Sequence, residues 1–564
     1  MPPSQSPLPF EAAPHDAALD TLLRRVLPAE AGVWDELRTP AGAVRGPWQR
    51  FAHWLPAPAE DTDLAQDLDR RVAQVAQQIR RDGVTHNVFS EAGVASRPWS
   101  LELLPLLIEP ADWAQIERGV VQRAALLEAM LADLYGAQRL LHQGLLPPAL
   151  LLRHPGYLRP MVGVEPTGGL RLHIVAFDLA RGPDGQWRVL AQRTQGPSGL
   201  GYVLHNRLTI SRQFPDAFRE LRVQHIASSY RRLLDTVDAM ARDVARGQTP
   251  RVVLLTPGPY SETYFEHAYL ARYLGLPLVE GGDLTVRGQR LFLKTVEGLE
   301  PVHGVLRRLD DDWCDPLELR PDSALGVPGL LQAARAGRVV MANALGSGFL
   351  ETPALQGFLP GICQALRGEP LAMPAVPSWW CGEDAAWRDV RAQIDGLTGL
   401  WNRKYFDSRL DGEFAEARRH GKPLSLIMTD IDKFKSLNDG YGHPFGDSVL
   451  EEFAHLLAGG RASDVACRYG GEEFGIVLPS TDIECARDVA ERFRERLAAI
   501  KWPRHDDLRV TASFGVADLS CIPAGGAPRS IVEAADQALY RAKHGGRNRV
   551  EIGTCAEPRL RKSA

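Results

Sequence analysis

The side chains whose types and spacing most clearly indicate chemistry lie around residue 470. The run Arg468-Tyr469-Gly470-Gly471-Glu472-Glu473 has strand-like flanks and places two adjacent carboxylates at or beside a predicted hairpin tip. The two glycines predict the positive φ values of a tight hairpin. Adjacent carboxylates repel each other, and a hard divalent cation bound to phosphates would relieve that repulsion, because Mg²⁺ prefers one or two carboxylates together with substrate oxygens.

A further acidic pair follows a hydrophobic run. Residues 424–429 (LSLIMT) predict a buried strand that ends at Asp430 and Asp432. Open α/β sheets usually bind their ligands at the C-terminal ends of central strands. Each pattern alone is weak evidence, because a GG turn followed by acids is most often only a hairpin and a DxD at a strand end most often begins a solvated loop.

Five segments in a fixed order carry more information than either pattern. Together they resemble a GGDEF domain, the diguanylate cyclase fold, over its whole extent. The segments are 395–406 (DGLTGLWNRKYF), 430–447 (DIDKFKSLNDGYGHPFGD), 468–474 (RYGGEEF), 510–517 (VTASFGVA) and 535–550 (ADQALYRAKHGGRNRV). The resemblance implies an α/β domain at 397–553 whose central sheet contains antiparallel strands, and a reaction in which two GTP molecules form cyclic di-GMP and two pyrophosphates.

The same resemblance assigns the catalytic and metal-binding roles. Asp430 and Glu472 would ligate Mg²⁺ or Mn²⁺ together with the Ile431 carbonyl, and Glu472 would also belong to the catalytic group. Glu473 would either help to deprotonate the attacking 3′-hydroxyl or hold a metal through water, and both roles stay open. Lys435 would stabilise the charge that develops on the phosphates.

Substrate contacts are assigned in the same way. Lys543 and Arg547 would hold the β and γ phosphates. Asn438 and Asp447 would read guanine, since a carboxylate can accept from both N1–H and the exocyclic amino group, a donor pair that adenine lacks. His443 matches a further substrate position, or else it is a turn histidine that packs the loop.

An inhibitory site for the product is implied upstream of the hairpin. Arg461 and Asp464 form an RxxD at the family's offset, with Arg492 as a second contact, although a lone RxxD is usually a surface ion pair. Each GGDEF domain would hold one GTP, so a two-fold symmetric product requires a homodimer.

The segment before this domain predicts a linker. Residues 367–383 are irregular and mark the expected domain edge, and 383–396 are expected to form a linker helix. Across 384–397, Trp387, Val390, Ile394 and Leu397 recur at the seam spacing of a short coiled coil. The alternative is a helix that packs on its own domain.

The N-terminal part, 21–382, also has an α/β pattern. Helical spacing covers 113–141 with a break at Gly136, a hairpin is expected around 183–185, and a short buried strand at 252–256 precedes a helix. Thr263 and Glu266 stand at capping-box spacing before that helix.

Residues from about 35 to 383 resemble the circularly permuted type 2 ATP-grasp proteins. The resemblance rests on three stretches: 252–281, 306–331 and 339–355. It implies ATP, Mg²⁺ and carboxylate–amine ligation, but 191–196 lack acidic residues ahead of the Pro197-Ser198-Gly199 motif, and the GGDEF segments begin where a nucleotide-binding region is expected. We therefore expect a truncated, degenerate module that senses a ligand or partner and orients the cyclase. Asp310, Asp311 and Asp312 are read as a metal site or, alternatively, an acidic loop start.

Composition limits which partners, which location and which functions can be expected for the protein. The 564 residues carry a net charge of −5, so the chain has no overall excess of positive charge with which to bind a nucleic acid polymer. The seven cysteines are dispersed along the sequence. No apolar run approaches the roughly 18 residues that span a bilayer, so a cytoplasmic protein is expected, with a disordered tail at 1–20 and another tail at 554–564. Besides the cyclase, the hypotheses are an inactive receptor for cyclic di-GMP or GTP and an ATP-dependent ligase in the N-terminal part.

Overall fold

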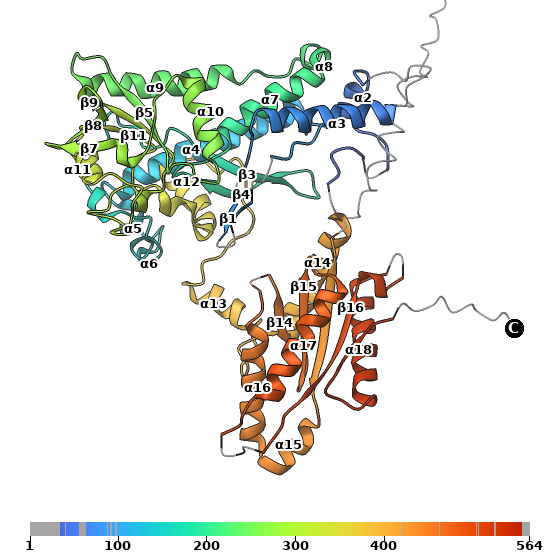
Figure 1. Cartoon of the computed structure of the whole chain (residues 1–564). Coiled ribbons are helices and arrows are strands. Elements are labelled where there is room, and N and C mark those ends of the chain that lie inside the picture. The colour runs from blue at the N-terminus through green and yellow to red at the C-terminus, as the bar shows by residue number, and fades with distance from the viewer. Residues whose placement is uncertain are drawn as a thin grey trace, which may run out of the picture. The chain divides into compact units, whose positions relative to one another are not determined.

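The computed structural model describes residues 34–554, except 40, 56–63, 87, 91–92, 96–98, 421, 462, 504, 506 and 524–525. The expected tail at 1–20 and nearly all of the one at 554–564 lie outside these residues. The chain divides into two compact units on either side of the Trp380–Cys381 bond, within the irregular 367–383 segment (Figure 1). Each unit is described by itself.

A four-stranded parallel sheet, in the order β11-β10-β5-β6, organises the N-terminal unit. Its strands are β11 (Val340–Ala342), β10 (Gly304–Arg307), β5 (Val252–Leu255) and β6 (Leu278–Val279). All four residues of β5 are buried, which explains its uninterrupted hydrophobic sequence. The prediction of a short buried strand followed by a helix, α10 (Tyr264–Leu274), is confirmed.

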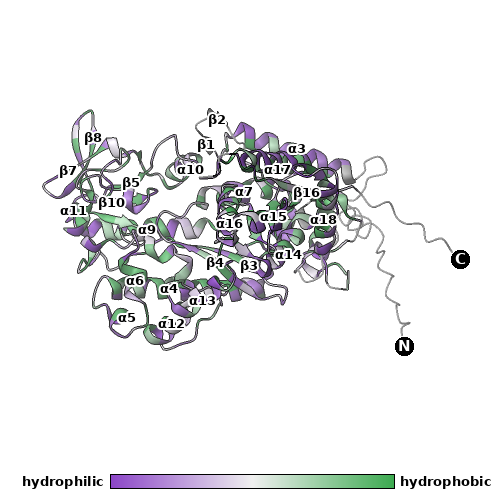
Figure 2. Ribbon diagram, turned by 90° about the horizontal axis from the view of Figure 1, so that it is seen from below, coloured by the Kyte–Doolittle hydropathy of each residue, from purple (hydrophilic) through white to green (hydrophobic). Residues whose placement is uncertain are grey.

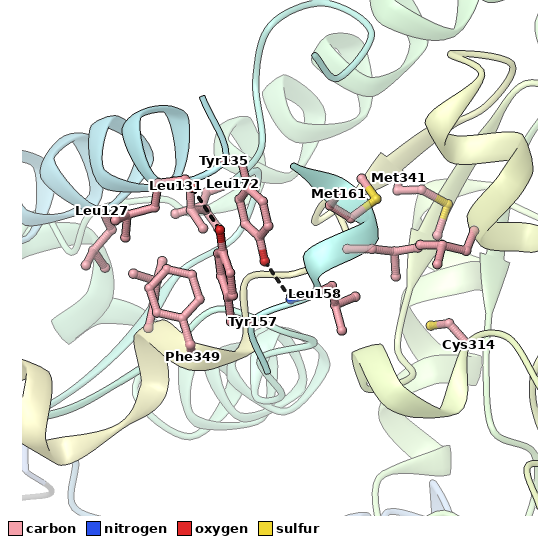
Figure 3. Packing of buried hydrophobic residues seen from close by; sticks show 14 of the residues in the cluster. Leu127, Leu131, Tyr135, Tyr157, Leu158, Met161, Leu172, Cys314, Met341 and Phe349 are labelled. Carbon is pink, nitrogen blue, oxygen red and sulfur yellow. Dashed lines mark hydrogen bonds between the residues drawn. The ribbon is translucent and has the colours of Figure 1, made fainter. Parts of the chain in front are cut away.

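The largest core of this unit packs around α4 (Pro110–Leu134), which is followed after Gly136 by α5 (Arg139–His142), as the expected break predicts. Tyr135 and Tyr157 stack with ring centroids 5.0 Å apart. The Tyr135 hydroxyl accepts from the Leu158 N–H at 3.0 Å (Figure 3). Buried tyrosines thus keep polar partners within an otherwise apolar core.

Smaller sheets and further helices complete the unit. The hairpin of β3 (Ala176–Arg181) and β4 (Trp187–Arg193) is confirmed, with Gly185 at a φ of +76° in its turn. A three-stranded antiparallel sheet contains β7 (Leu284–Arg287), β8 (Arg290–Thr295) and β9 (Gly298–Val302), and a short hairpin contains β1 (Val88–Ser90) and β2 (Gly93–Ala95). The remaining helices are α2 (Gly46–Ala52), α3 (Leu64–Arg81), α6 (Pro148–Leu152), α7 (Leu200–Gln213), α8 (Pro215–Glu220), α9 (Ala227–Ala245), α11 (Leu330–Arg335) and α12 (Leu359–Arg367).

Helix α3 illustrates how little apolar surface is needed to place a helix. Most of its ribbon is hydrophilic in Figure 2. Leu68, Val75 and Ile79 recur at helical spacing and are buried in a cluster with residues of α7. One narrow apolar stripe therefore fixes the face that α3 turns inward.

The C-terminal unit is a six-stranded mixed sheet with helices on both faces. The strand order is β12-β14-β15-β13-β16-β17, antiparallel at its centre and parallel at both edges. Helices α14 (Arg403–His420) and α18 (Pro528–His544) pack on one face, and α15 (Phe434–Tyr441), α16 (His443–Ala458) and α17 (Ile483–Ala499) pack on the other. The strands are β12 (Trp401–Asn402), β13 (Leu424–Ile431), β14 (Val465–Arg468), β15 (Glu473–Pro479), β16 (Ala512–Asp518) and β17 (Val550–Ile552).

Strand β13 lies in the middle of this sheet and is buried along its whole length. Leu424, Leu426 and Met428 belong to the α14 and α18 face, whereas Ile427 and Ile431 belong to the other face. This alternation is the two-residue period of a strand, and it lets both faces of β13 carry large apolar side chains. Its C-terminal end is the place where the acidic residues emerge.

The linker helix is shorter than predicted. Helix α13 covers only Asp384–Arg391. Ile394 instead forms a β-bridge with Trp401, and Leu397 packs against the core of the C-terminal unit. The prediction of a coiled-coil seam is therefore wrong beyond Val390, because Ile394 and Leu397 make tertiary contacts instead.

Candidate active site

The hairpin between β14 and β15 is held differently from the sequence expectation. Neither Gly470 nor Gly471 has a positive φ. Arg468 pairs with Phe474, so the connection is wider than a two-residue turn, and the Tyr469 and Gly470 amides both donate to the Glu473 carbonyl at 2.8 and 3.1 Å. A Cβ at position 470 would lie 2.9 Å from Glu473 Oε2. Gly470 thus leaves room for a carboxylate.

Arg468 braces this hairpin, a role that sequence reasoning missed. Its Nε and Nη2 donate to the Gly471 carbonyl at 3.2 and 2.7 Å, and its Nη1 donates to Asp395 Oδ1 at 2.9 Å. Asp395 also accepts from the amide and the hydroxyl of Thr398. The turn that carries the two glutamates is thereby tied to the first residues of the domain.

Four of the predicted residues meet at the end of β13. Asp430 and Glu473 are direct partners in the antiparallel register of β13 and β15. The Ile431 N–H donates to the Glu472 carbonyl at 3.3 Å, which brings the turn beside the strand end. Sheet register, rather than sequence proximity, therefore assembles Asp430, Ile431, Glu472 and Glu473.

Within the described residues, one lysine forms an ion pair with this acidic group and offsets part of its charge. Lys543 Nζ lies 2.7 Å from Asp430 Oδ2, and Asp430 is only 6% exposed. Burial raises the pKa of Asp430, and Glu473 and Asp432 raise it further, against the lowering effect of Lys543. Burial also raises the pKa of Glu472, followed by repulsion from Asp430. The arrangement has more negative charge than its one ammonium neutralises.

The surplus of negative charge at the end of β13 is suited to a divalent cation. Within the described residues, no group of three or more His, Cys, Asp or Glu side chains could hold a metal ion by itself. The predicted set has only two carboxylates, Asp430 and Glu472, and one carbonyl. Such an incomplete set suits Mg²⁺, which keeps sites for water and phosphate oxygens.

The predicted guanine-reading residues lie on α15 and α16, which pack together. Asn438 on α15 lies against Gly446, where any Cβ would overlap its amide oxygen. Asp447 is the next residue on α16, and His443 is one turn before it, so both are on the same exposed face. Lys435 is exposed in the first turn of α15.

The residues of the predicted inhibitory site are only partly brought together. Asp464 Oδ2 accepts from the backbone N–H of Arg461 at 3.0 Å, so the RxxD closes its own turn. The pKa of Cys485, in the first turn of α17, is raised mainly by its hydrogen bond with Asp482, and the Arg461 charge acts in the opposite direction. Arg492 lies two helical turns after Cys485, and therefore on the same face of α17.

In the N-terminal unit, the three aspartates do not converge. Asp311 is buried against Arg307 at 2.8 Å and accepts from the Gly348 N–H, whereas Asp312 is exposed and pairs with Arg320. The second of the two readings, an acidic loop start, describes them. The acidic run continues into a short 3₁₀ turn at Asp311–Trp313.

The capping-box expectation for α10 is wrong. Thr263 makes no side-chain cap, and Glu266 turns away from its own helix. Its Oε2 accepts from the Gly199 N–H at 2.6 Å, and its Oε1 lies 2.8 Å from Arg308 Nη2. A buried carboxylate thus already occupies the N-terminus of α7, directly after the Pro197-Ser198-Gly199 motif.

Comparison with protein families identifies both parts of the chain. Residues 105–400 match the family described as circularly permuted ATP-grasp type 2. The chain belongs to this family. Residues 392–549 match the diguanylate cyclase GGDEF domain, so the chain also carries a GGDEF domain of the diguanylate cyclase type. The two matched ranges overlap at 392–400.

Curated relatives match somewhat under two thirds of the chain. An uncharacterized protein of Mycobacterium tuberculosis is 42% identical over 373 residues, which cover 64% of this chain and 41% of that protein. An uncharacterized protein of Synechocystis is 38% identical over 358 residues, covering 63% of this chain and 72% of that protein. The chain thus spans about two fifths of the length of the mycobacterial relative.

Solved structures match the C-terminal part. The GGDEF domain of DgcB from Caulobacter crescentus, in complex with c-di-GMP, is 37% identical, with coverage of 28% of this chain and 93% of that chain and a TM-score of 0.27. The active GGEEF domain of a diguanylate cyclase from Vibrio cholerae is 37% identical, with coverage of 28% and 99% and a TM-score of 0.26. Separately, the described part of the chain contains no helix that is long and apolar enough to cross a membrane.

Proposed function

We propose that the C-terminal unit is an active diguanylate cyclase that condenses two GTP molecules into cyclic di-GMP and two pyrophosphates. The observation that carries this proposal is the assembly of Asp430, Glu472 and Glu473 beside Lys543 at the end of β13. Three neighbouring carboxylates, of which Asp430 pairs with Lys543, are suited to a metal-bound triphosphate, and the GGDEF family match supports that assignment.

Asp430, Glu472 and the Ile431 carbonyl would hold Mg²⁺ or Mn²⁺. When bound, the cation supplies charge neutralisation for the triphosphate and orients it for in-line displacement. Burial is the main cause that raises the pKa values of Asp430 and Glu472, and repulsion between neighbouring carboxylates, which this cation would offset, raises them further.

The chain's own residues carry the rest of the chemistry. In each half-reaction the 3′-oxygen of one GTP forms a bond to the α-phosphorus of the other, the bond to pyrophosphate breaks, and the 3′-hydroxyl proton leaves. Glu473 is the strand partner of Asp430, and in this proposal it would take that proton directly or through water. Lys543, Arg547 and Lys435 would bind the phosphates and stabilise their developing charge.

Base selection would depend on Asn438 and Asp447, with His443 beside Asp447 on the same helical face. Because each domain would supply one GTP, the two-fold product requires two copies of the chain to meet face to face. A cytoplasmic location, where GTP is available, goes with this proposal.

Regulation would come from two sources. Cyclic di-GMP would bind at Arg461, Asp464 and Arg492 as a feedback ligand, and the ATP-grasp-derived unit would control the orientation of the cyclase domains. An ATP-dependent ligase activity in that unit has less support, because Glu266 already caps the α7 N-terminus that follows the Pro197-Ser198-Gly199 motif.

The decisive test incubates the full chain with GTP and Mg²⁺ or Mn²⁺ and measures cyclic di-GMP and pyrophosphate. We expect both products from the wild-type protein and almost none from Glu473→Ala. No product from the wild type, together with tight binding of cyclic di-GMP, would establish the receptor alternative instead. Arg461→Ala should keep the initial rate and lose the slowing at late times, and persistent slowing would refute the inhibitory site.

A further inference from the structure

Asp432, two residues after Asp430, has a set of partners that differs from those of the other acids. Its Oδ1 accepts from the Ser513 hydroxyl at 2.6 Å. Its Oδ2 accepts from the Thr511 hydroxyl at 2.7 Å and from the backbone N–H of Asn548 at 3.0 Å. The Asp432 N–H also donates to the Thr511 carbonyl at 2.8 Å. Asp432 therefore joins the end of β13 to the edge of β16 and to the segment after α18.

The segment that Asp432 holds has an unusual backbone. Gly546, Arg547 and Asn548 have φ values of +116°, +61° and +44° in succession. For a residue with a side chain, the left-handed region costs about 1–2 kcal/mol, so two such residues in a row require compensating contacts.

Few contacts supply that compensation. The Arg547 N–H donates to the Ala542 carbonyl, the Asn548 amide oxygen accepts from Arg494 at 3.2 Å, and the Asn548 N–H donates to Asp432. The bonds to Arg494 and to Asp432 both have a charged partner, which is the strongest class of hydrogen bond, but of these two only the bond to Asp432 holds the backbone of the turn. Loss of this bond would remove a constraint on the backbone of the turn beside Arg547.

Arg547 depends on this backbone for its position. Its side chain is exposed, and the described residues provide no hydrogen bond or ion pair to its guanidinium. Lys543, by contrast, is anchored on α18 and contacts Asp430. The direction of Arg547 is therefore set by the left-handed turn and not by a side-chain partner.

We propose that Asp432 is a positioning residue that holds the Gly546–Asn548 turn, so that Arg547 faces the triphosphate beside Lys543. This inference rests on the proposed cyclase function for its purpose, but the turn itself can be tested without activity. Asp432 is not a third metal ligand in this proposal, because three hydrogen bonds already use most of its acceptor positions.

The first experiment measures hydrogen exchange in the full chain without nucleotide. In Asp432→Ala, the amides of 546–549 should exchange about tenfold faster than in the wild type, because a hydrogen bond to a charged acceptor is lost. Asp432→Asn should restore most of the protection, since its oxygen can still accept from Asn548 and its amino group can donate to Ser513. Unchanged exchange in Asp432→Ala, or equal loss in both variants, would overturn the proposal.

The second experiment is a double-mutant cycle on the affinity for a non-hydrolysable GTP analogue with Mg²⁺. If Asp432 acts through Arg547, Asp432→Ala should weaken binding, yet add nothing in an Arg547→Ala background. In a Lys543→Ala background its effect should persist, which provides the matched control. Additive losses with Arg547→Ala would contradict the inference and indicate a direct role for Asp432.

The two experiments separate the two proposals. A wild-type protein that neither binds the analogue nor makes cyclic di-GMP would end the proposed function, while hydrogen exchange would still decide whether Asp432 holds the turn. If Asp432→Ala does not fold, Ser513→Ala and Thr511→Val each remove one partner. Each should then give a smaller acceleration of exchange in 546–549, and no acceleration in either would refute the positioning role.

Discussion

Replacing Arg468 by alanine should loosen the hairpin that carries Glu472 and Glu473. The guanidinium makes two bonds to the Gly471 carbonyl and one to Asp395, and its side chain is 16% exposed. A hydrogen bond with a charged partner contributes about 1.5–3 kcal/mol, and a partly exposed ion pair adds little. We therefore expect a loss of about 2 kcal/mol in the local free energy of opening, which corresponds to about 30-fold in the opening equilibrium.

Hydrogen exchange of the full chain at neutral pH measures this quantity directly. Burial acts to raise the pKa of Asp395, but its bonds to Thr398 and Arg468 lower it overall from 3.8. Its stabilising contribution is present above the unfolded pKa and disappears as the pH falls through the lowered folded value. At neutral pH the assay thus reports the full contribution of the Arg468–Asp395 contact.

A matched control is available on α17. Like Arg468, Arg487 has two partners, here the acids Glu484 and Asp488, but all three side chains are exposed. Arg487→Ala should leave the exchange of 469–475 unchanged, whereas Arg468→Ala should accelerate it. Equal exchange in Arg468→Ala and wild type would refute the view that this guanidinium holds the hairpin.

Three further perturbations test other parts of the structure. Gly446→Ala should displace the Asn438 amide and weaken the affinity for a GTP analogue, whereas Gly440→Ala, whose Cβ meets nothing within 4 Å, should stabilise α15 by about 0.5–1 kcal/mol in thermal unfolding. Glu472→Gln should raise the melting temperature at neutral pH: the pKa of Glu472 is raised by burial and by repulsion, so its folded form loses stability as the pH rises from 4.5 upward. A lower melting temperature in that variant would contradict the surplus of negative charge. Arg308→Met should cost about 3–5 kcal/mol in denaturant unfolding of the N-terminal unit, because it leaves Glu266 buried without its partner; an unchanged midpoint would show that the pair contributes little.

Local patterns were sufficient for many elements. The hydrophobic run before Asp430 predicts β13, and the turn at 183–185 predicts the hairpin of β3 and β4, because each signal is contained within a few neighbouring residues. The break at Gly136 between α4 and α5 is of the same kind. The resemblance carried by the ordered GGDEF segments also predicts the residues of the candidate site.

Other sequence expectations failed where a side chain had a distant partner. Glu266 was placed in the capping box of its own helix, but it caps α7 because Arg308 and the α7 amides are closer neighbours in the fold. The predicted coiled-coil seam ended at Val390 because Ile394 pairs with Trp401. The hairpin glycines were expected to provide positive φ, whereas Gly470 provides space for Glu473.

The sequence by itself determined which residue types stand at the candidate site and in what order, because those depend on short motifs and on the two-residue period of β13. Only the tertiary structure decided how their charges are compensated. Lys543 reaches Asp430 from α18, and Asp432 holds the turn before β17, through contacts between segments far apart in the chain. A carboxylate has the same sequence signature whether it faces a metal, a lysine or a backbone amide, so its partner is fixed by packing alone.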